Sequence, residues 1–510
     1  MSVAWIRPRP VRDRFLPSAS HWSSEEISDA DIPATEELGE LLYARGFLLA
    51  PHRHDVPVAH WRQVRIGELW LSYDPRSACA VVRSGHSWVA VLGRVICLET
   101  WDDDVRSIAT ALLRAKASGR DAFLDRIDGL SGRFAVIYNE GAETYLQSDA
   151  ASLRSVYFGR RDGRTYAASH AHLVADRVGT VPSAFPDPQT IRKECNAYAF
   201  PGRVTQFARV FALTPNTELA FGIAEPRRFF PREALAPRVT EDAVDEVLPL
   251  LQRQLELLAS RTPLVISLTA GLDSRTTLAL SRSIKDQVDY FTYDSKTGAG
   301  ESGAAMRADV AAAREMSEDL GFRHHRIQSR FRIPPEPLAG IMDRNSKRIS
   351  APGLYGTHRL YEGGCRGLHI RSNLYEIARS FYRAKRTQPD RLTPEHMAYL
   401  LTSRKTTPES FAATFAEFAD AVEFDRAQDL YDPLDLYYWE HRCGTWLAAH
   451  HIESDVVFDT FTIFNSRRIY KALLALPLED RISGAAFVEM IRRTWPESLK
   501  FPVNGAIIEA

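Results

Sequence analysis

The run Leu264–Arg275 places a strand, a turn and the start of a helix directly after one another. Its first residues are apolar and β-branched, which is typical of a short buried parallel strand. The small residues Thr269–Gly271 then predict a turn, and Thr276–Leu280 can form the first turns of a helix. In such a unit the backbone N–H groups and the positive helix end face an anion, so the run predicts a phosphate cradle.

Asp273 places a carboxylate inside this turn. A carboxylate beside bound phosphates commonly holds Mg²⁺, because Mg²⁺ prefers one or two carboxylates together with phosphate oxygens. Two other phosphate loops are excluded, since the run contains neither Gly-x4-Gly-Lys-Ser/Thr nor Gly-x-Gly-x-x-Gly. An ordinary strand-to-helix turn remains the alternative interpretation of this stretch.

The segment Thr269–Ser274 resembles the pyrophosphate loop of the AMP-forming ATP pyrophosphatases, usually written Ser-Gly-Gly-x-Asp-Ser. Thr269 keeps the hydroxyl of the first Ser, and Ala270 fits the first Gly position only if that position does not need φ > 0. The resemblance implies bound ATP and Mg²⁺. Nucleotides bind parallel sheets at the carboxyl ends of the strands, and the residues expected to contact ATP are Ser267, Thr269, Ala270, Gly271, Leu272, Asp273, Ser274, Thr292 and Tyr293.

Strands and helices alternate through the second half of the chain, which predicts a parallel sheet. A helix is expected to begin with Thr240 as its N-cap and to kink or split at Pro249. From Ala398 to His451 the pattern is mostly helical. Between these parts we expect strand Val288–Tyr293, a polar loop Asp294–Arg307, a helix Ala308–Leu320 and strand His324–Ile327.

The segment Asp309–His325 resembles the helix "D-x-x-A-A-x-x-V-A-x-x-L-G-x-x-H-H" of asparagine synthetases. Residues that match without a gap are Asp309, Ala312, Ala313, Leu320, Gly321, His324 and His325. We assign them structural roles: Asp309 as the helix N-cap, the two alanines as close contacts with the sheet, Gly321 as the C-cap and the histidines as strand residues.

A second metal carboxylate is expected after the Gly-rich turn 363–367. Leu368–Arg379 lies where the family has "S-G-E-G-x-D-E", whose Asp helps to hold Mg²⁺, and Ser372 can take the place of the first Ser. No carboxylate then falls on the Asp position, so the alignment of 368–379 stays open and Glu376 is the only acid within reach. We predict that Asp273 and Glu376 bind Mg²⁺ between the β- and γ-phosphates; a salt bridge from Glu376 to Arg379 is the alternative.

Lys500 lies in a C-terminal segment, Leu499–Gly505, that resembles the family's "K-x-x-F-x-x-G". The resemblance implies that Lys500 neutralises the α-phosphate and the developing oxyanion. A solvated terminal lysine is the alternative. Lys500 and Glu376 are therefore the predicted catalytic residues, and no general base is identifiable.

The first half of the chain predicts an α+β domain with antiparallel sheets, because short strands alternate with turns such as Arg161–Gly163. Ile127–Ala135, Gln147–Phe158 and Ala167–His170 resemble, in order, three segments of the glutaminase domain of asparagine synthetases. This implies an N-terminal α+β Ntn-hydrolase-like sandwich at 1–235. A Pro-rich linker, Pro226–Pro237, would join it to an α/β ATP-pyrophosphatase (adenine nucleotide α-hydrolase-like) domain at 238–510 with C-terminal helices.

The glutaminase chemistry itself is expected to be absent. Such a domain needs an N-terminal Cys, and this chain has Ser2. The oxyanion-hole Asn-Gly pair of the family is replaced by Leu92-Gly93, and losing such a donor costs a factor of about 10² to 10³. In this respect the chain resembles β-lactam synthetases and lasso-peptide cyclases, whose N-terminal domains supply no ammonia.

The amino-acid composition limits which cellular compartment and which partners fit this chain. The five cysteines form no Cys-x-x-Cys pair, which argues against a disulfide framework or zinc site and fits a reducing cytoplasm. The formal net charge of −1 gives no general attraction to nucleic acid or anionic membrane. We expect no signal peptide and no membrane span. The sequence is compatible with a homodimer.

The sequence thus predicts an ATP-dependent, AMP- and pyrophosphate-forming C–N ligase. It would adenylate a small-molecule or peptide carboxylate and couple it to an amine of the same or a second substrate. Two alternatives stay open: an ammonia-dependent carboxamide-forming amidotransferase, and a catalytically degenerate scaffold protein. The identity of the acid and of the amine is not encoded in any recognisable motif.

Overall fold

The computed structural model describes residues 35–185, 188–295, 301–347, 351–361, 366–383, 389–404 and 407–508. Twelve strands in the first half form two six-stranded antiparallel sheets. One sheet has the order β10-β8-β9-β1-β3-β2, with Phe211–Ala212, Tyr157–Arg161, Arg164–Ala168, Phe47–Ala50, Leu69–Tyr73 and Arg62–Ile66. The other has the order β12-β11-β7-β6-β5-β4, with Glu225–Arg228, Thr217–Ala220, Glu143–Ser148, Leu130–Glu140, Ser87–Cys97 and Cys79–Ser84.

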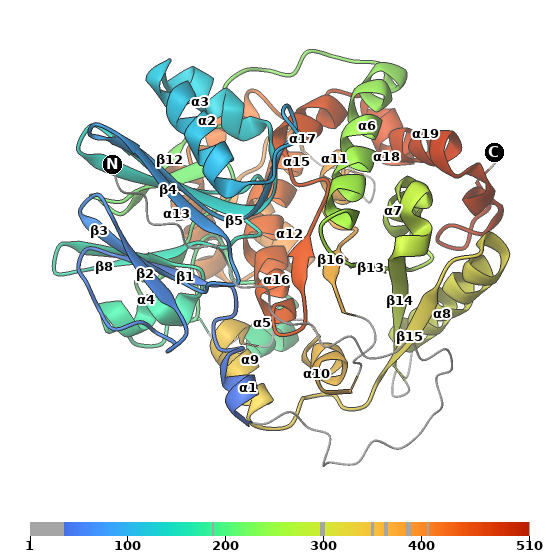
Figure 1. The fold of residues 1–510 in the computed structure, drawn as a ribbon, viewed down its shortest axis with the longest axis horizontal. Helices are drawn as coiled ribbons and strands as arrows, with labels where there is room; N and C mark the ends of the chain where they lie inside the picture. The colour runs from blue at the N-terminus through green and yellow to red at the C-terminus, as the bar shows by residue number, and fades with distance from the viewer. Residues whose placement is uncertain are drawn as a thin grey trace.

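The two sheets enclose an apolar layer that includes Phe47, Leu92 and Ile137. Alternate residues of each strand point into this layer, as expected for packed antiparallel sheets. Helices α2 (Val105–Ala117) and α3 (Arg120–Asp128) accompany the second sheet, and α4 (Ala171–Val178) covers the first. The first half is therefore an α+β sandwich, as its strand pattern predicts (Figure 1).

The second half contains a five-stranded parallel sheet of order β15-β14-β13-β16-β17. Its strands are His324–Ser329, Val288–Ser295, Leu264–Ser267, Leu368–Ile370 and Asp459–Phe461. Leu264 and Ile266 face one side, where α6 (Thr240–Ala259), α7 (Leu272–Leu280) and α19 (Ala485–Thr494) pack. Val265 faces the other side, toward α9 (Leu338–Ser346), α10 (Pro352–Tyr361) and α16 (Ala448–Ser454), and Figure 1 shows α9 and α10 away from α6, α7 and α19.

Further helices complete the second half and the connections. These are α1 (Thr35–Gly39), α5 (Pro188–Cys195), η2 (Arg282–Gln287), α8 (Glu301–Leu320), α11 (Tyr375–Ala378), α12 (Pro394–Thr402), α13 (Glu409–Ala421), α14 (Phe424–Gln428), α15 (Pro433–Tyr437), the π-helix η3 (Tyr438–Leu447), α17 (Arg467–Leu474), α18 (Leu478–Ser483) and η4 (Pro496–Lys500). No helix in these described ranges is both long and apolar enough to cross a membrane.

Several local predictions were wrong. Helix α6 runs unbroken through Pro249, and its N-cap is Val239, while Thr240 Oγ1 donates to Asp480 Oδ2 at 2.7 Å. A proline removes one helical hydrogen bond, and the buried neighbours Val247, Leu250 and Leu251 hold this helix against the core.

Two predicted loops contain regular structure. Pro226 lies in β12 and pairs with Leu219, so the connection between the halves begins after this strand. Helix α8 begins at Glu301 rather than Ala308. The polar loop expected at Asp294–Arg307 is thus helical over its last residues, and 296–300 lie outside the described ranges.

Buried ion pairs join the two halves. Both terminal nitrogens of Arg133 donate to Asp455, at 2.5 and 2.8 Å, and both terminal nitrogens of Arg228 donate to Glu440, at 2.6 and 2.8 Å. All four side chains are at most 7% exposed as residues. Breaking one partner of such a pair leaves an uncompensated buried charge, so these contacts fix how the sandwich meets the parallel sheet.

Candidate functional site

The turn after β13 is closed by two hydroxyl groups. Thr269 Oγ1 and Ser274 Oγ lie 2.8 Å apart, and Ser274 Oγ also accepts the Thr269 N–H at 3.1 Å. The Gly271 N–H donates to Thr269 Oγ1 at 3.2 Å. Ala270 has no positive φ and Gly271 has a φ of −77°. The alanine that departs from the pyrophosphate-loop pattern therefore fits without backbone strain.

Contacts from distant segments hold the turn from outside. Asp309 Oδ1, inside α8, accepts the Ala270 N–H at 2.8 Å, and the Asn504 N–H donates to the Ala270 carbonyl at 3.0 Å. The prediction of Asp309 as an N-cap was wrong, because α8 starts eight residues earlier and leaves this carboxylate free to reach the loop. Gly321, by contrast, follows α8 with a φ of +66° and ends the helix as predicted.

Arg275 anchors the C-terminal segment to the same helix. Its guanidinium is fully buried and donates to the carbonyls of Ser498, Phe501 and Pro502. Loss of solvation lowers the pKa of Arg275 to about 10, so it stays charged at neutral pH. This clamp brings Asn504 to the edge of the loop.

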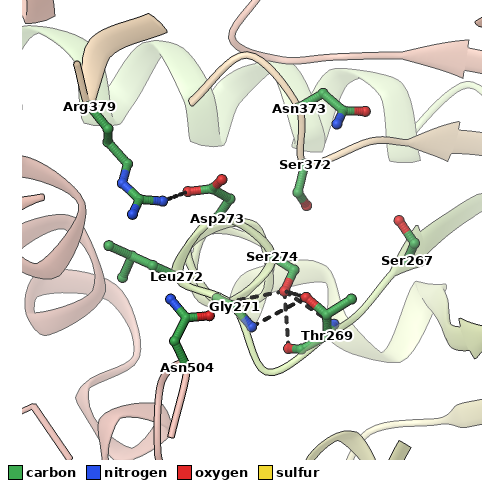
Figure 2. A pocket seen from close by; sticks show the side chains of 10 residues that line it. All are labelled: Ser267, Thr269, Gly271, Leu272, Asp273, Ser274, Ser372, Asn373, Arg379 and Asn504. Atoms are coloured by element: carbon green, nitrogen blue, oxygen red, sulfur yellow. Dashed lines mark hydrogen bonds and ion pairs between the residues drawn. The ribbon is translucent and has the colours of Figure 1, made fainter. Parts of the chain in front are cut away.

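A cavity of about 260 Å³ opens above the turn (Figure 2). Its lining residues are Ser267, Thr269, Gly271, Leu272, Asp273, Ser274, Ser372, Asn373, Arg379 and Asn504. The chain proceeds from β13 outward to β14 and β15, and later returns to β16 on the other side of β13. The cavity thus lies at the point where the strand order reverses, which is where open α/β sheets bind ligands. Its volume is slightly below that of common ligand pockets and suits a polyphosphate.

An ion pair between one guanidinium and one carboxylate borders this cavity. Arg379 Nη1 lies 2.6 Å from Asp273 Oδ1, and the two side chains are 27% and 19% exposed. Burial raises the pKa of Asp273, and the Arg379 charge opposes that rise. The first N–H groups of α7 lack intrahelical partners and make that end positive. An anion at this end meets the helix terminus and a guanidinium.

Glu376 lies close to this cavity without lining it. Its Oε2 is buried and has no hydrogen-bond partner in the described parts of the chain. Burial, followed by the charge of Asp273, raises the pKa of Glu376 to about 7, so the two carboxylates lie within electrostatic reach. The alternative salt bridge from Glu376 to Arg379 is replaced by the pair between Arg379 and Asp273.

The oxygen donors present are those that Mg²⁺ prefers. Asp273 and the unpartnered Oε2 of Glu376 supply two carboxylates, although the described ranges contain no group of three or more His, Cys, Asp or Glu residues that could hold a metal ion. Two carboxylates together with phosphate oxygens would complete such a site. Their role as Mg²⁺ ligands stays a prediction.

Of the remaining residues predicted to contact ATP or its phosphates, only one lines the cavity. Ser267 lines the cavity and its Oγ lies 3.0 Å from His369 Nε2. Thr292 is buried and donates to the Leu268 carbonyl at 2.8 Å, while the Tyr293 hydroxyl lies 3.0 Å from His358 Nδ1. Neither side chain lines the cavity. Lys500 is exposed at the end of η4 and does not line it either.

Residues that the sequence left without a role complete the lining. Arg379, Asn373 and Asn504 reach the cavity (Figure 2). Asn504 lies in the same C-terminal segment as Lys500, so this segment borders the cavity although Lys500 itself does not line it.

Leu92, predicted from the resemblance to replace the oxyanion-hole Asn, lies between the two antiparallel sheets. Leu92 is 1% exposed and packs in the apolar layer, and its hydrocarbon side chain offers no hydrogen-bond donor. Ser2 lies outside the described residues.

Comparisons with known proteins give distant likenesses. No family model and no curated protein matches the chain. Solved structures that it resembles include an allosteric regulatory enzyme of purine biosynthesis (13% identity, TM-score 0.24, covering 45% of this chain and 56% of the other). A second is the glutamine phosphoribosylpyrophosphate amidotransferase from B. subtilis complexed with ADP and GMP (10%, 0.23, 76% and 85%). A third is the U34-tRNA thiolase NcsA from Methanococcus maripaludis (15%, 0.19, 36% and 65%). At these TM-scores no functional conclusion follows.

Proposed function

We propose that the protein is an ATP-dependent C–N ligase of the asparagine synthetase, β-lactam synthetase and lasso-peptide cyclase superfamily. One observation carries the proposal. The loop Thr269–Ser274 is closed by its two hydroxyls, lies at the start of α7 and holds Asp273 at the point where the strand order reverses. That combination suits the pyrophosphate portion of ATP.

The proposed reaction has two steps. A carboxylate oxygen of the substrate forms a bond to the α-phosphorus of ATP while the bond to the β-phosphate oxygen breaks, which releases pyrophosphate. An amine then forms a bond to the acyl carbon, loses a proton and displaces AMP. Both steps develop negative charge on oxygen, which fixed positive groups stabilise.

Residues of this chain have distinct parts in that scheme. The N–H groups at the start of α7 would bind the leaving pyrophosphate, and Arg379, held beside Asp273, would neutralise part of its charge. Asp273 and Glu376 would hold Mg²⁺, which supplies charge neutralisation for the phosphates when bound. Lys500 would have to approach from the solvent-exposed C-terminal segment.

The antiparallel sandwich bears on the source of the amine. With Leu92 buried at the position of the oxyanion donor, glutamine hydrolysis in the first half is not supported. The amine would therefore belong to the substrate or to a second substrate. A cytoplasmic location and a carboxylate partner, small or peptidic, belong to this proposal.

The test incubates the protein with labelled ATP and a panel of carboxylic acids, and it measures both the AMP and the pyrophosphate that are released. Expected products are AMP and pyrophosphate, and exchange of labelled pyrophosphate into ATP should depend on the acid. Asp273→Asn should lower exchange at least about 100-fold, a loss typical of removing a key electrostatic group. Asp286→Asn, at an exposed site on η2, is the matched control.

Other outcomes separate the alternatives. If ammonium supports product formation without another nucleophile, the ammonia-dependent amidotransferase is favoured. If no acid in the panel supports exchange and ATP does not bind, the scaffold interpretation replaces the ligase.

A further inference from the structure

A second cavity, of about 530 Å³, lies where the sandwich, the connection between the halves and the parallel-sheet half meet. Residues that line it come from the C-terminal end of α3, from 233–238 in the connection, and from α6 and α17. Figure 1 shows this connection reaching α6 across the top of the molecule. None of these lining residues also lines the cavity above Thr269–Ser274. The volume is typical of pockets for small organic ligands, so this cavity can hold a ligand of its own.

One face of α17 forms a wall of this cavity. Its lining residues Arg468, Lys471, Ala472 and Ala475 are spaced by three and four positions, which places them on the same side of the helix. The two alanines are short enough to leave space beside the helix. Residues 234–236 of the connection, two alanines and a leucine, add further aliphatic surface. The wall between the charged groups therefore suits an alkyl chain.

At the end of α3, two lining carboxylates share a single nitrogen. Arg232 Nη2 lies 2.5 Å from Asp125 Oδ1 and 2.7 Å from Asp128 Oδ2. Asp128 is 6% exposed, and its Oδ1 is buried without a hydrogen-bond partner in the described parts of the chain. Arg467 Nε lies 3.9 Å from that oxygen and donates instead to Asn216 at 3.1 Å. Burial raises the pKa of Asp128, and the nearby guanidinium groups oppose that rise. Buried polar atoms are rarely left unpaired, so Asp128 lacks a donor that an ammonium group would supply.

The part of the lining near α6 and α17 has the reverse arrangement. Two guanidinium groups share one carboxylate: Arg238 Nη1 lies 2.6 Å from Glu246 Oε2, and Arg468 Nε lies 3.3 Å from Glu246 Oε1. These three side chains are between 30% and 40% exposed. Lys471 is matched by Glu233 at 2.7 Å. Exposed ion pairs contribute little to stability, so the two arginines can turn toward a ligand carboxylate, whose shape matches a guanidinium.

We propose that this cavity binds a small aliphatic zwitterion, with its ammonium group at Asp128 and Asp125 and its carboxylate at Arg468 and Arg238. The charges of the lining are complementary to such a ligand, because carboxylates outnumber their cation at α3 and guanidinium groups outnumber their carboxylate at α6 and α17. A bound ligand would touch the sandwich and the parallel-sheet half together and stabilise their contact. The cavity shares no lining residue with the proposed ligase centre, so ligand binding here does not depend on that reaction.

The experiment measures binding to the full chain by calorimetry. The probes are glycine, β-alanine, γ-aminobutyrate and ε-aminocaproate, which vary the separation of the two charges. Each is compared with the alkylamine and the fatty acid of the same number of carbons. At least one zwitterion should bind at least about 10-fold more tightly than both of its references, because a hydrogen bond to a charged group contributes about 1.5–3 kcal/mol. Asp128→Asn and Arg468→Gln should each weaken that binding at least about 10-fold.

Two matched controls remove an exposed ion pair elsewhere. Asp162→Asn lies on the turn between β8 and β9, and Arg314→Gln lies on α8; both should bind the zwitterion as the wild type does. Circular dichroism and thermal unfolding show whether each variant is folded, and if Asp128→Asn is not folded, Arg468→Gln alone decides the result. The proposal is overturned if no zwitterion binds more tightly than its single-charge references, or if the folded Asp128 and Arg468 variants bind it with wild-type affinity.

Discussion

The contact between Asp309 and the loop Thr269–Ser274 yields a decisive prediction. Asp309 Oδ1 accepts the Ala270 N–H at 2.8 Å across 39 residues of sequence. The carboxylate of Asp309 is half-buried and directed at the loop. Burial raises its pKa, and the hydrogen bond from the Ala270 N–H opposes that rise. Asp309→Ala removes the acceptor and leaves an N–H that only water can satisfy.

The size of the effect follows from the bond. A hydrogen bond to a charged group contributes about 1.5–3 kcal/mol, and partial exposure favours the lower end. If the loop must adopt this conformation to bind phosphate, a loss of about 1.4 kcal/mol weakens ATP binding about 10-fold. Asp309→Asn keeps an oxygen acceptor without the charge and should lose about half of that free energy.

Calorimetric titration with ATP and urea unfolding of the same samples test this reasoning. An N-cap role, which the sequence suggested, would lower the free energy of unfolding and leave the Kd of ATP unchanged. A loop-positioning role changes the Kd of ATP in Asp309→Ala more than in Asp309→Asn. Equal ATP affinity in the wild type and Asp309→Ala would refute the loop argument.

Three further outcomes are expected. Because burial raises the pKa of Glu376 in the folded state from 4.5 to about 7, the folded state holds this proton more tightly than the unfolded state. The resulting stabilisation is complete below about pH 4.5 and disappears as the pH rises to about 7. Glu376→Gln should therefore flatten the pH dependence of the free energy of urea unfolding between these values, and an unchanged pH dependence would contradict the assignment. Leu92→Ala should cost about 2–5 kcal/mol in urea unfolding, since Leu92 is 1% exposed between the sheets, whereas the exposed control Val181→Ala should change little. Arg275→Met removes the donors for three carbonyls of 498–502, so limited proteolysis should cut the C-terminal segment sooner than in the wild type; equal cleavage rates would show that other contacts hold it.

Local patterns predicted the strand-turn-helix unit at β13 and α7 because its parts are neighbours in sequence. The strand, turn and helix of Leu264–Leu280 were predicted correctly, whereas the contact between the Thr269 and Ser274 hydroxyls emerges only from the structure. The α+β sandwich of the first half also follows from alternating strands and turns, which are local signals. The connection was misjudged because Pro226 is tolerated in the edge strand β12.

Residue roles that depend on distant contacts could not be read from the sequence. Asp309 looked like an N-cap because a Gly-rich stretch precedes it, yet α8 already begins at Glu301. Glu376 and Arg379 looked like a local pair, but Arg379 binds Asp273, which is 106 residues away. Pairing across such separations is set by strand order, and strand order has no local signature.

The same strand order explains why Asn373 received no role from the sequence. The chain from 371 to 373 follows a three-residue strand, and nothing nearby indicates that β16 lies beside β13 rather than at the sheet edge. That adjacency brings His369 to Ser267 and places Ser372 and Asn373 in the lining of the cavity above the Thr269–Ser274 loop. The loop itself is thus formed by one short run of sequence, whereas the β16 side of the cavity exists only once the parallel pairing of β13 with β16 has formed.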